Sequence, residues 1–322
     1  MDSFALDSAI KKAWEYQFLT YPNPAVGASV IVNNTLFVSS HKKAGEAHAE
    51  VNVLWEAFSA FHEVPSLKTS HEIHQYLRKH HNGFFKDAKV YVTLEPCSHV
   101  GKTPSCAELL KTLKPKSVTI GWQEVINSHA GGAEMLRNSG IEVDVLNDKR
   151  CYDLIEPFIK WSEGRFIFYK LAQNLNGAIE GGYISSEESL DWVHKVRDKT
   201  DLLIIGGNTV RIDRPTLDSR RIGGKAPDVL ILSKNKHFDK TIPLFNVADR
   251  KVYISDSLEM VKEYNFIMVE GGEGIYESIK EFVDWKVFIL SPTLVNRDNY
   301  KLKDRFDVLH VNVAEDLIIF GR

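Results

Sequence analysis

Apolar and polar positions along the first half of the chain follow two periods, one helical and one extended. Apolar residues recur at helical spacing over residues 3–19, and the Tyr-Pro-Asn-Pro stretch at residues 21–24 ends that pattern. Residues 25–32 and 35–39 read as strands and predict a hairpin. Further helices are predicted over residues 47–61, 104–113 and 132–139, and further strands over residues 89–94, 117–121 and 142–146. Strands that alternate with helices predict an α/β sandwich.

A histidine-rich segment, residues 62–87, interrupts this alternation. His71 and His74 stand three positions apart, which is the spacing of a metal clip on a helix. An apolar stripe that includes Ile73 and Leu77 predicts an amphipathic helix here, and we expect it to leave both histidines on the solvated face. We therefore interpret the segment as a surface insertion rather than a metal site.

A polar run at residues 147–150 marks the expected domain boundary. A chain of 322 residues is long for one hydrophobic core, so we expect two domains, residues 1–146 and 147–322. A connecting helix is predicted over residues 151–161. Beyond it, strands are predicted over residues 165–172, 202–205, 229–233, 251–255 and 266–269, and helices over residues 190–197 and 275–282. The second half is thus a separate α/β unit with its own core.

Composition and charge narrow the class of protein. The chain is 43% hydrophobic and 26% charged, as in ordinary globular proteins, and its net charge of -3 gives no general attraction to nucleic acid or anionic membranes. Its first residues lack the basic flank and apolar run of a signal peptide, and no stretch approaches the roughly 20 apolar residues of a membrane span. Three cysteines form no even-numbered disulfide framework. We expect a cytosolic protein without nucleic-acid or membrane partners.

Two cysteines, a histidine and a glutamate stand where a metal site requires them. His48 and Glu50 lie in the first turn of a predicted helix, Cys97 follows a predicted strand, and Cys106 lies in the first turn of another predicted helix. Residues two apart on a helix do not share a face, so His48 and Glu50 can address one metal only if it lies off the N-terminal end. We expect two helix N-termini to point at one ion, where their dipoles favour both thiolates.

A neutral histidine with two thiolates suits Zn²⁺ that keeps one position open for water. Glu50 then serves as the proton shuttle, which takes a proton from the water and returns protons to a ring nitrogen and to departing ammonia. This His-x-Glu and Pro-Cys arrangement is typical of zinc deaminases. The alternative is a closed structural site with Cys151 or His99 as fourth ligand, which gives Glu50 no role.

Three stretches carry a resemblance to a known family: residues 22–27 (Pro-Asn-Pro-Ala-Val-Gly), residues 44–51 (Ala-Gly-Glu-Ala-His-Ala-Glu-Val), and residues 92–106, which hold both cysteines. With them the sequence resembles the bifunctional riboflavin-biosynthesis deaminase/reductases. Eight residues separate the cysteines here, against two in typical cytidine deaminases. The resemblance implies a cytidine-deaminase-like three-layer sandwich with one zinc ion per chain. It also implies a pocket for a phosphorylated pyrimidine lined by Asn23, His41, His99, Lys102 and Thr103.

The resemblance continues at lower identity over most of residues 147–322. It implies a dihydrofolate-reductase-like α/β domain that uses NADPH. The sequence contains no Gly-x-Gly-x-x-Gly motif, so we do not expect a Rossmann domain. It assigns substrate binding to Arg197, Leu217, Arg220 and Glu270, and cofactor binding to Ala172, Tyr183, Thr209, Asp213, Gly271, Gly272 and Gly274. The guanidinium forks of the two arginines suit a substrate phosphate. We also expect a homo-oligomer, either a dimer or a tetramer.

The function expected from this resemblance has two steps, so the chain would be both a hydrolase and an oxidoreductase. The first removes the amino group of 2,5-diamino-6-(5-phosphoribosylamino)pyrimidin-4(3H)-one, and the second reduces the ribosyl group of 5-amino-6-(5-phosphoribosylamino)uracil to ribityl. Asn176, Tyr183 and Arg214 depart from the family pattern of the reductase. Two alternatives stay open: a deaminase whose reductase-like domain is degenerate and kept for stability or oligomerisation, and a non-catalytic scaffold stabilised by zinc.

Overall fold

The computed structural model describes residues 2–99, 103–126, 130–179, 184–299, 301 and 304–322. The chain forms two compact units, Met1–Ile159 and Lys160–Arg322. The division falls inside the helix α6 (Lys149–Glu163), whereas we expected it before residue 147. Most of α6 belongs to the first unit because it packs there: Gln17 Nε2 donates a 3.0 Å hydrogen bond to the carbonyl oxygen of Leu154.

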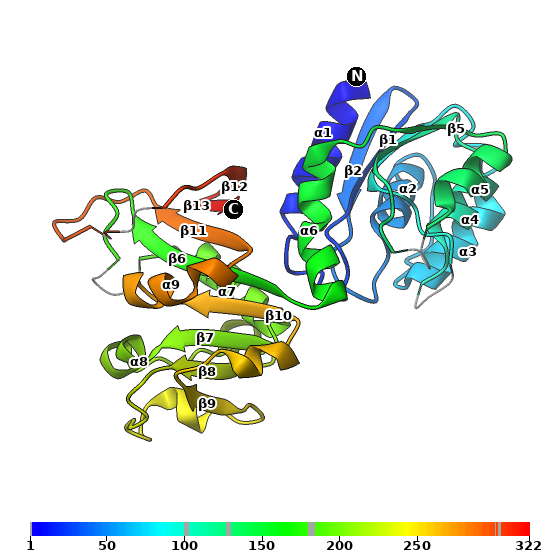
Figure 1. The fold of residues 1–322 in the computed structure, drawn as a ribbon. Coiled ribbons are helices and arrows are strands. Elements are labelled where there is room, and N and C mark those ends of the chain that lie inside the picture. The colour runs from blue at the N-terminus through cyan, green and yellow to red at the C-terminus, as the bar shows by residue number, and fades with distance from the viewer. Residues whose placement is uncertain (1, 100–102, 127–129, 180–183, 300, 302–303) are drawn as a thin grey trace. The chain divides into compact units, whose positions relative to one another are not determined.

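A five-stranded sheet forms the centre of the first unit. Its strands are β1 (Gly27–Val32), β2 (Thr35–Ser40), β3 (Lys89–Leu94), β4 (Ser117–Trp122) and β5 (Glu142–Val145), and its helices besides α6 are α1 (Asp2–Trp14), α2 (Ala49–Ser59), α3 (Ser70–His80), α4 (Cys106–Leu113) and α5 (Gly132–Asn138). The order is β2-β1-β3-β4-β5, with β1 antiparallel to β2 and β3, and with β3, β4 and β5 parallel. Figure 1 shows α1 and α6 on one face and α2 to α5 on the other, which confirms the predicted three layers.

Alternation along the strands explains the core of this unit. Val90 and Val92 of β3 are fully buried, and Val118 and Ile120 of β4 join them in one apolar cluster with α2 and α4. Side chains on a strand alternate between faces, so these residues share one face of the sheet. Because β3 and β4 are parallel, their carboxyl ends lie at the same edge, and the chain that leaves β3 enters the loop of Cys97 there.

The histidine-rich segment forms α3, and one of our expectations for it is wrong. His71 is exposed as expected, but His74 is only 1% exposed and lies on the buried side with Ile73 and Leu77. The segment is also more than a surface insertion, because α3 packs against both α2 and α4. A stripe of apolar residues on a helix is wide enough to bury a neighbouring polar residue when that residue finds a partner.

An eight-stranded sheet forms the second unit. Its strands are β6 (Phe166–Asn174), β7 (Leu202–Gly206), β8 (Asp228–Leu232), β9 (Val252–Ser255), β10 (Phe266–Glu270), β11 (Trp285–Ser291), β12 (Val308–Val313) and β13 (Leu317–Gly321), and its α-helices are α7 (Glu187–Lys199), α8 (Gly207–Asp213) and α9 (Glu273–Ile279). The order is β12-β13-β11-β6-β10-β7-β8-β9. The six strands β6 to β11 run parallel to one another, whereas β13 is antiparallel to both of its neighbours, β11 and β12.

The parallel strands place their carboxyl ends at one edge of this sheet. The turns that follow β7 and β10 lie side by side there, since these two strands are neighbours. Ligands of open α/β sheets bind at this edge, outside the carboxyl ends of the strands. Among the residues that the structure describes, none of the helices combines the length and the apolar character that a bilayer crossing requires.

Candidate functional site

The three predicted metal ligands come together at one edge of the first sheet. His48 is the N-cap residue of α2, Cys97 follows β3, and Cys106 is the first residue of α4. His48 Nδ1 lies 3.5 Å from Cys106 Sγ and 3.8 Å from Cys97 Sγ, and all three donor atoms are within 4.8 Å of one another. Two helix N-termini and one strand end therefore converge on a single point.

The first turn of α4 clamps Cys97. The backbone N–H of Cys106 donates to Cys97 Sγ at 3.5 Å, and the N–H of Ala107 donates to the carbonyl oxygen of Cys97 at 3.2 Å. The hydroxyl of Ser105, the N-cap residue of α4, donates to the same carbonyl at 2.8 Å. A hydrogen bond from the Cys106 thiol holds the pKa of Cys97 well below its usual range. Helix N-termini favour thiolates, so this position supplies one.

Thr103 fixes the orientation of the histidine ligand. Its Oγ1 lies 3.1 Å from His48 Nε2. When Nε2 donates to this hydroxyl, the lone pair of Nδ1 faces the two sulfur atoms, which is how partners of metal-binding histidines usually select the tautomer. The resemblance assigns Thr103 to the substrate pocket; its hydrogen bond in the structure is to the ligand His48.

Glu50 lies in the first turn of α2 and is 3% exposed. Its Oε2 makes no hydrogen bond with the residues that the structure describes. Burial raises the pKa of Glu50 to about 7. A buried carboxyl group with a pKa near neutrality can both accept and donate a proton, which is what a proton shuttle requires.

A cavity of about 400 Å³ opens beside these groups. His48, Glu50 and Cys97 line it, and Cys106 lies buried behind them. Four of the five residues expected to bind the pyrimidine substrate also line it: Asn23, His41, His99 and Thr103. The fifth, Lys102, lies outside the described residues.

His41 is a buried neutral base at the wall of this cavity. It is 3% exposed, and its Nδ1 donates to the carbonyl oxygen of Ala47 at 3.1 Å. Its Nε2 is then free to accept the 3.0 Å hydrogen bond from the side-chain amide of Asn23. Burial lowers the pKa of His41 to about 4. The ring therefore holds the amide of Asn23 in one orientation at the wall of the cavity.

The cavity has further wall residues that the sequence alone did not single out, among them Glu95 and Phe158. Glu95 accepts hydrogen bonds from the backbone N–H of Ala133 at 2.8 Å and of Glu124 at 3.1 Å. It thereby ties the loop after β4 and the start of α5 to the strand end that leads to Cys97. A charged residue directly after a buried strand was the signal that could have identified it.

A closed four-ligand site is not what the described residues form. The donor group there comprises His48, Cys97 and Cys106 alone. Cys151 is fully buried against Gly121, where an added Cβ would come within 2.3 Å of its Sγ, and burial raises the pKa of Cys151 to about 12. His99 lines the cavity and is not part of the donor group.

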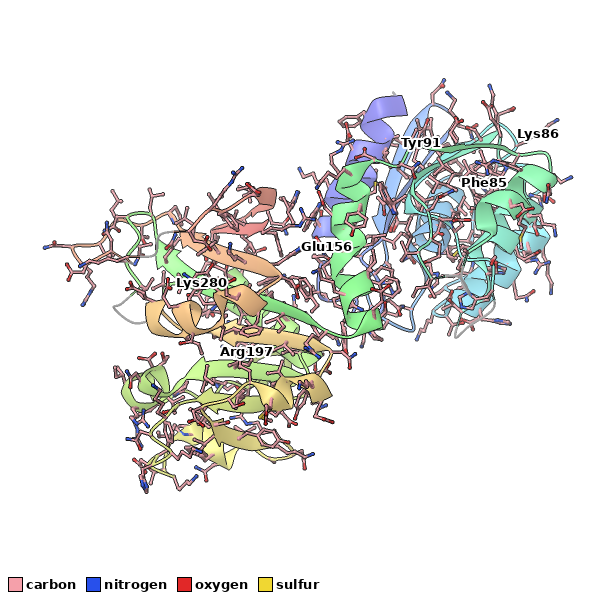
Figure 2. All side chains as sticks on the ribbon, in the orientation of Figure 1. Phe85, Lys86, Tyr91, Glu156, Arg197 and Lys280 are labelled. Carbon is pink, nitrogen blue, oxygen red and sulfur yellow. The ribbon has the colours of Figure 1, made fainter. Side chains whose placement is uncertain are left out.

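In the second unit, a buried ion pair stands at the end of β10. Arg197 of α7, which Figure 2 labels, uses its fork on Glu270. Its Nε donates to Oε1 and its Nη2 to Oε2, both at 2.9 Å, and Lys170 Nζ lies 3.8 Å from Oε2. The side chains of Arg197 and Glu270 are each 12% exposed. The effect of burial is to raise the pKa of Glu270, but the positive charges of Arg197 and Lys170 outweigh it. The pKa of Glu270 therefore lies below its ordinary value. The fork that we expected to face a phosphate thus faces a carboxylate.

Two glycine turns meet Thr209 at the carboxyl edge of this sheet. Gly271 has φ 136°, and a Cβ there would lie 2.8 Å from Ile275 Cγ2 and 3.6 Å from Thr209 Oγ1. A Cβ on Gly206 would lie 3.8 Å from the same Thr209 atom. Only glycine fits Gly271 without strain, and its bare backbone permits a ligand to approach closely.

The remaining residues expected to bind in the reductase unit are spread around this edge. Arg220 is exposed and pairs with Asp218 at 2.6 Å. Leu217 is buried with φ 56°, and its carbonyl oxygen accepts a hydrogen bond from Arg250, a residue that the sequence did not indicate. Ala172 is half-buried on β6, Asp213 and Gly274 are exposed, Gly272 follows Gly271 directly, and Tyr183 lies outside the described residues.

Comparison with known families agrees with both units. The family described as the cytidine and deoxycytidylate deaminase zinc-binding region matches residues 1–122, and the RibD C-terminal domain matches residues 165–297. The fold and the site thus define a class of protein in which a zinc-binding deaminase domain precedes a reductase domain. The chain belongs to the RibD family.

Individual relatives show how far the similarity extends. The riboflavin biosynthesis protein RibD of Synechocystis is 34% identical over 228 residues, which are 67% of this chain and 55% of that protein. The RibD protein of Aquifex aeolicus is 27% identical, and its alignment covers 99% of this chain and 98% of that protein. A crystal structure of a diaminohydroxyphosphoribosylaminopyrimidine deaminase/5-amino-6-(5-phosphoribosylamino)uracil reductase from Thermotoga maritima shares the fold, with a TM-score of 0.66, 23% identity and coverage of 99% and 97% of the two chains.

Proposed function

We propose that this chain catalyses two steps of riboflavin biosynthesis. The first is the zinc-dependent hydrolytic deamination of 2,5-diamino-6-(5-phosphoribosylamino)pyrimidin-4(3H)-one. The second is the NADPH-dependent reduction of the ribosyl group of 5-amino-6-(5-phosphoribosylamino)uracil to ribityl. The observation that carries the proposal is the buried, unpartnered Oε2 of Glu50, which lies at one cavity with the donors His48, Cys97 and Cys106. The names of the similar proteins support the choice of substrate.

The donor set fits zinc. One imidazole nitrogen and two sulfurs within 4.8 Å of one another suit Zn²⁺, and three protein ligands leave the fourth position for water. Zinc, when bound, supplies this chemistry by lowering the pKa of that water toward neutrality. The amide N–H of Cys106, at the start of α4, helps to hold Cys97 as the thiolate that such an ion requires.

Glu50 moves the protons of the deamination. Water adds to the ring carbon that bears the amino group, and the carboxylate of Glu50 takes the proton that the water loses. The same carboxyl group gives this proton to the ring nitrogen. It then takes the remaining proton of the added hydroxyl group as the carbonyl forms and gives it to the amino group, which leaves as ammonia. Its position in the first turn of α2, two residues after His48, keeps it beside the donor atoms throughout.

Asn23 and the loop between the two cysteines select the substrate. His41 orients the Asn23 amide at the cavity wall, so this amide is preset for the polar edge of a pyrimidine. The loop from Cys97 to Cys106 carries His99 and Thr103 at the same cavity. A loop of this length between the two cysteines can bring groups to the ribose and phosphate that a shorter connection does not reach.

The second unit supports the reduction through the edge formed by Gly206, Gly271 and Thr209. The bare backbone of Gly271 beside the Thr209 hydroxyl provides the close approach that a dinucleotide needs. NADPH, when bound, supplies the hydride for the opened ribosyl group. The exposed guanidinium of Arg220 can receive the substrate phosphate, and Lys170, in the middle of β6, offers an ammonium group beside Glu270.

The test records the two activities as separate signals. Purified, zinc-loaded protein receives the diaminopyrimidinone ribotide and NADPH, while ammonia release and NADPH oxidation are followed independently. We expect one ammonia and one oxidised NADPH for each substrate molecule. Ammonia without NADPH oxidation would leave only the deaminase and assign the second unit a structural role. Neither signal from protein that holds zinc would overturn the proposal.

A further inference from the structure

A buried histidine of the helix α3 contacts Ser105, the residue that precedes the ligand Cys106. His74 is 1% exposed, and its Nε2 lies 3.1 Å from the carbonyl oxygen of Ser105. A carbonyl oxygen only accepts hydrogen bonds, so Nε2 carries the proton. Nδ1 makes no hydrogen bond with the residues that the structure describes, and burial lowers the pKa of the ring, which keeps it neutral. The hydrogen bond to Ser105 thus satisfies the Nε2–H group of the buried His74 ring.

Ser105 is the residue through which α4 holds Cys97. Its hydroxyl donates to the Cys97 carbonyl oxygen at 2.8 Å and accepts from the backbone N–H of Glu108 at 3.2 Å, so it caps the helix and ties it to the ligand loop. Its carbonyl oxygen accepts from Leu109 N–H at 3.3 Å, within the helix, as well as from His74. The hydroxyl group and the carbonyl oxygen of Ser105 therefore each take part in two hydrogen bonds.

The helix α3 also contacts the element that carries the third ligand. It packs against α4, which begins at Cys106, and against α2, whose N-cap is His48. A change in the position of α3 relative to α4 would move Cys106 and the amides that clamp Cys97. Metal ligands need partners that fix their orientation, and such partners commonly lie outside the ligand set itself.

We propose that His74 is a positioning residue for the zinc site: through the Ser105 carbonyl it fixes the N-terminus of α4, and with it the relative positions of Cys97 and Cys106. This inference rests on the proposed function only in that the three donors bind zinc. It predicts that loss of the hydrogen bond weakens zinc binding even when an apolar side chain fills the space of the imidazole.

Three variants separate this role from simple packing. His74→Leu removes the donor and keeps an apolar side chain in the core, whereas His74→Gln keeps an N–H donor on a side chain of similar reach. His71→Leu, on the exposed side of the same helix, is the matched control. Zinc affinity is measured by competition with a chelator, and the absorption spectrum of the Co²⁺-substituted protein reports the geometry of the thiolates. Thermal unfolding is recorded for every variant.

We expect His74→Leu to bind zinc about tenfold more weakly, at the lower end of what outer partners of metal ligands contribute, and to change the Co²⁺ spectrum. His74→Gln restores most of the affinity, and His71→Leu matches the wild type. Wild-type affinity and spectrum in His74→Leu would overturn the inference. Equal weakening in the Leu and Gln variants, in step with equal losses of thermal stability, would also overturn it by showing a packing role. Because no substrate is used, a protein that binds zinc without releasing ammonia would sink the proposed function and leave this test intact.

Discussion

Two buried glutamates, one in each unit, lie in opposite electrostatic surroundings. Glu50 is 3% exposed, its Oε2 has no hydrogen-bond partner among the described residues, and burial raises its pKa to about 7. Glu270 is also buried, but both of its oxygens meet the fork of Arg197, with Lys170 close by, and its pKa lies below the ordinary value. The same side chain is therefore left free for proton transfer in one unit and held as a fixed anion in the other.

This difference teaches where each site keeps its chemistry. A carboxyl oxygen without a hydrogen-bond partner is costly to bury, and such atoms persist where a reaction uses them. A carboxylate bonded to two cations is fully satisfied, and it orders the residues that hold it. We infer that Glu50 acts on the reacting atoms of the deamination. Glu270 instead organises Arg197 and Lys170 at the edge of the second sheet that we propose for the reduction.

The largest effect should follow from removing a donor of the metal group. Cys106→Ala takes away the buried thiol at the start of α4, so we expect the zinc content to fall from one ion per chain to nearly none. Ammonia release should fall with it, while NADPH oxidation with the deaminated substrate continues. Metal analysis and the two-signal assay measure this.

Cys151→Ser is the control for that experiment. Cys151 lies outside the donor group and packs against Gly121. Zinc content and ammonia release should match the wild type. Loss of zinc in this variant would contradict the three-ligand site and revive the closed one.

The second effect concerns stability in the other unit. Glu270→Gln leaves the guanidinium of Arg197 and the ammonium of Lys170 buried without a countercharge, and breaking a buried pair in this way costs about 3 kcal/mol. We expect the second unit to unfold at lower denaturant concentration and NADPH oxidation to fall, with ammonia release unchanged. Glu273→Gln, an exposed glutamate three residues along the chain, is the matched control. If Glu270→Gln unfolds like the wild type, the pairing is not what stabilises this edge.

The pH dependence of stability should distinguish His194 from Glu270. Burial, with a contribution from Arg197, lowers the pKa of His194 from 6.5 to about 4. The folded protein then binds fewer protons than the unfolded chain, so the stability that His194 contributes is complete above pH 6.5 and is lost as the pH falls toward 4. His194→Gln should flatten this part of the profile. Identical profiles of variant and wild type between these two pH values would refute the assignment.

Glu270 contributes to the pH dependence of stability in a more acidic range than His194. Its folded-state pKa lies below the ordinary value of 4.5, so its contribution is present above pH 4.5 and disappears as the pH falls through the lowered pKa. The stability difference between wild type and Glu270→Gln should therefore be constant near neutrality and shrink only in acid. A difference that vanishes already above pH 4.5 would show that Glu270 is not held as an anion.

The deaminase edge could be predicted because its signals are local. The strand predicted over residues 89–94 is confirmed. The helix predicted over residues 104–113 ends at Leu113 as expected, but it begins at Cys106, with Ser105 as its N-cap residue. Period-two alternation and a polar cap identify such elements from a few neighbouring residues. Once a strand end and two helix starts were placed, the residues at them indicated where His48, Cys97 and Cys106 would meet.

Long-range pairing could not be predicted. The fork of Arg197 meets a carboxylate 73 positions away, and the sequence indicated only that a guanidinium was present. His74 finds its acceptor 31 positions away on α4, and helical periodicity cannot name a partner on another helix. The sequence also missed α8, which begins with a glycine, and the strands β11 to β13, because these elements depend on packing against the rest of the second sheet.

The most direct test of the account replaces Glu50 by Gln in the zinc-loaded protein and measures ammonia release. The variant keeps the shape of the side chain and removes its ability to carry a proton, so we expect ammonia release to fall about 10³-fold. Zinc content, thermal stability and NADPH oxidation with the deaminated substrate should not fall, and Glu46→Gln, an exposed neighbour, should match the wild type in every signal. Ammonia release at the wild-type rate from Glu50→Gln would contradict the central claim that the buried carboxyl group of Glu50 carries the protons of the deamination.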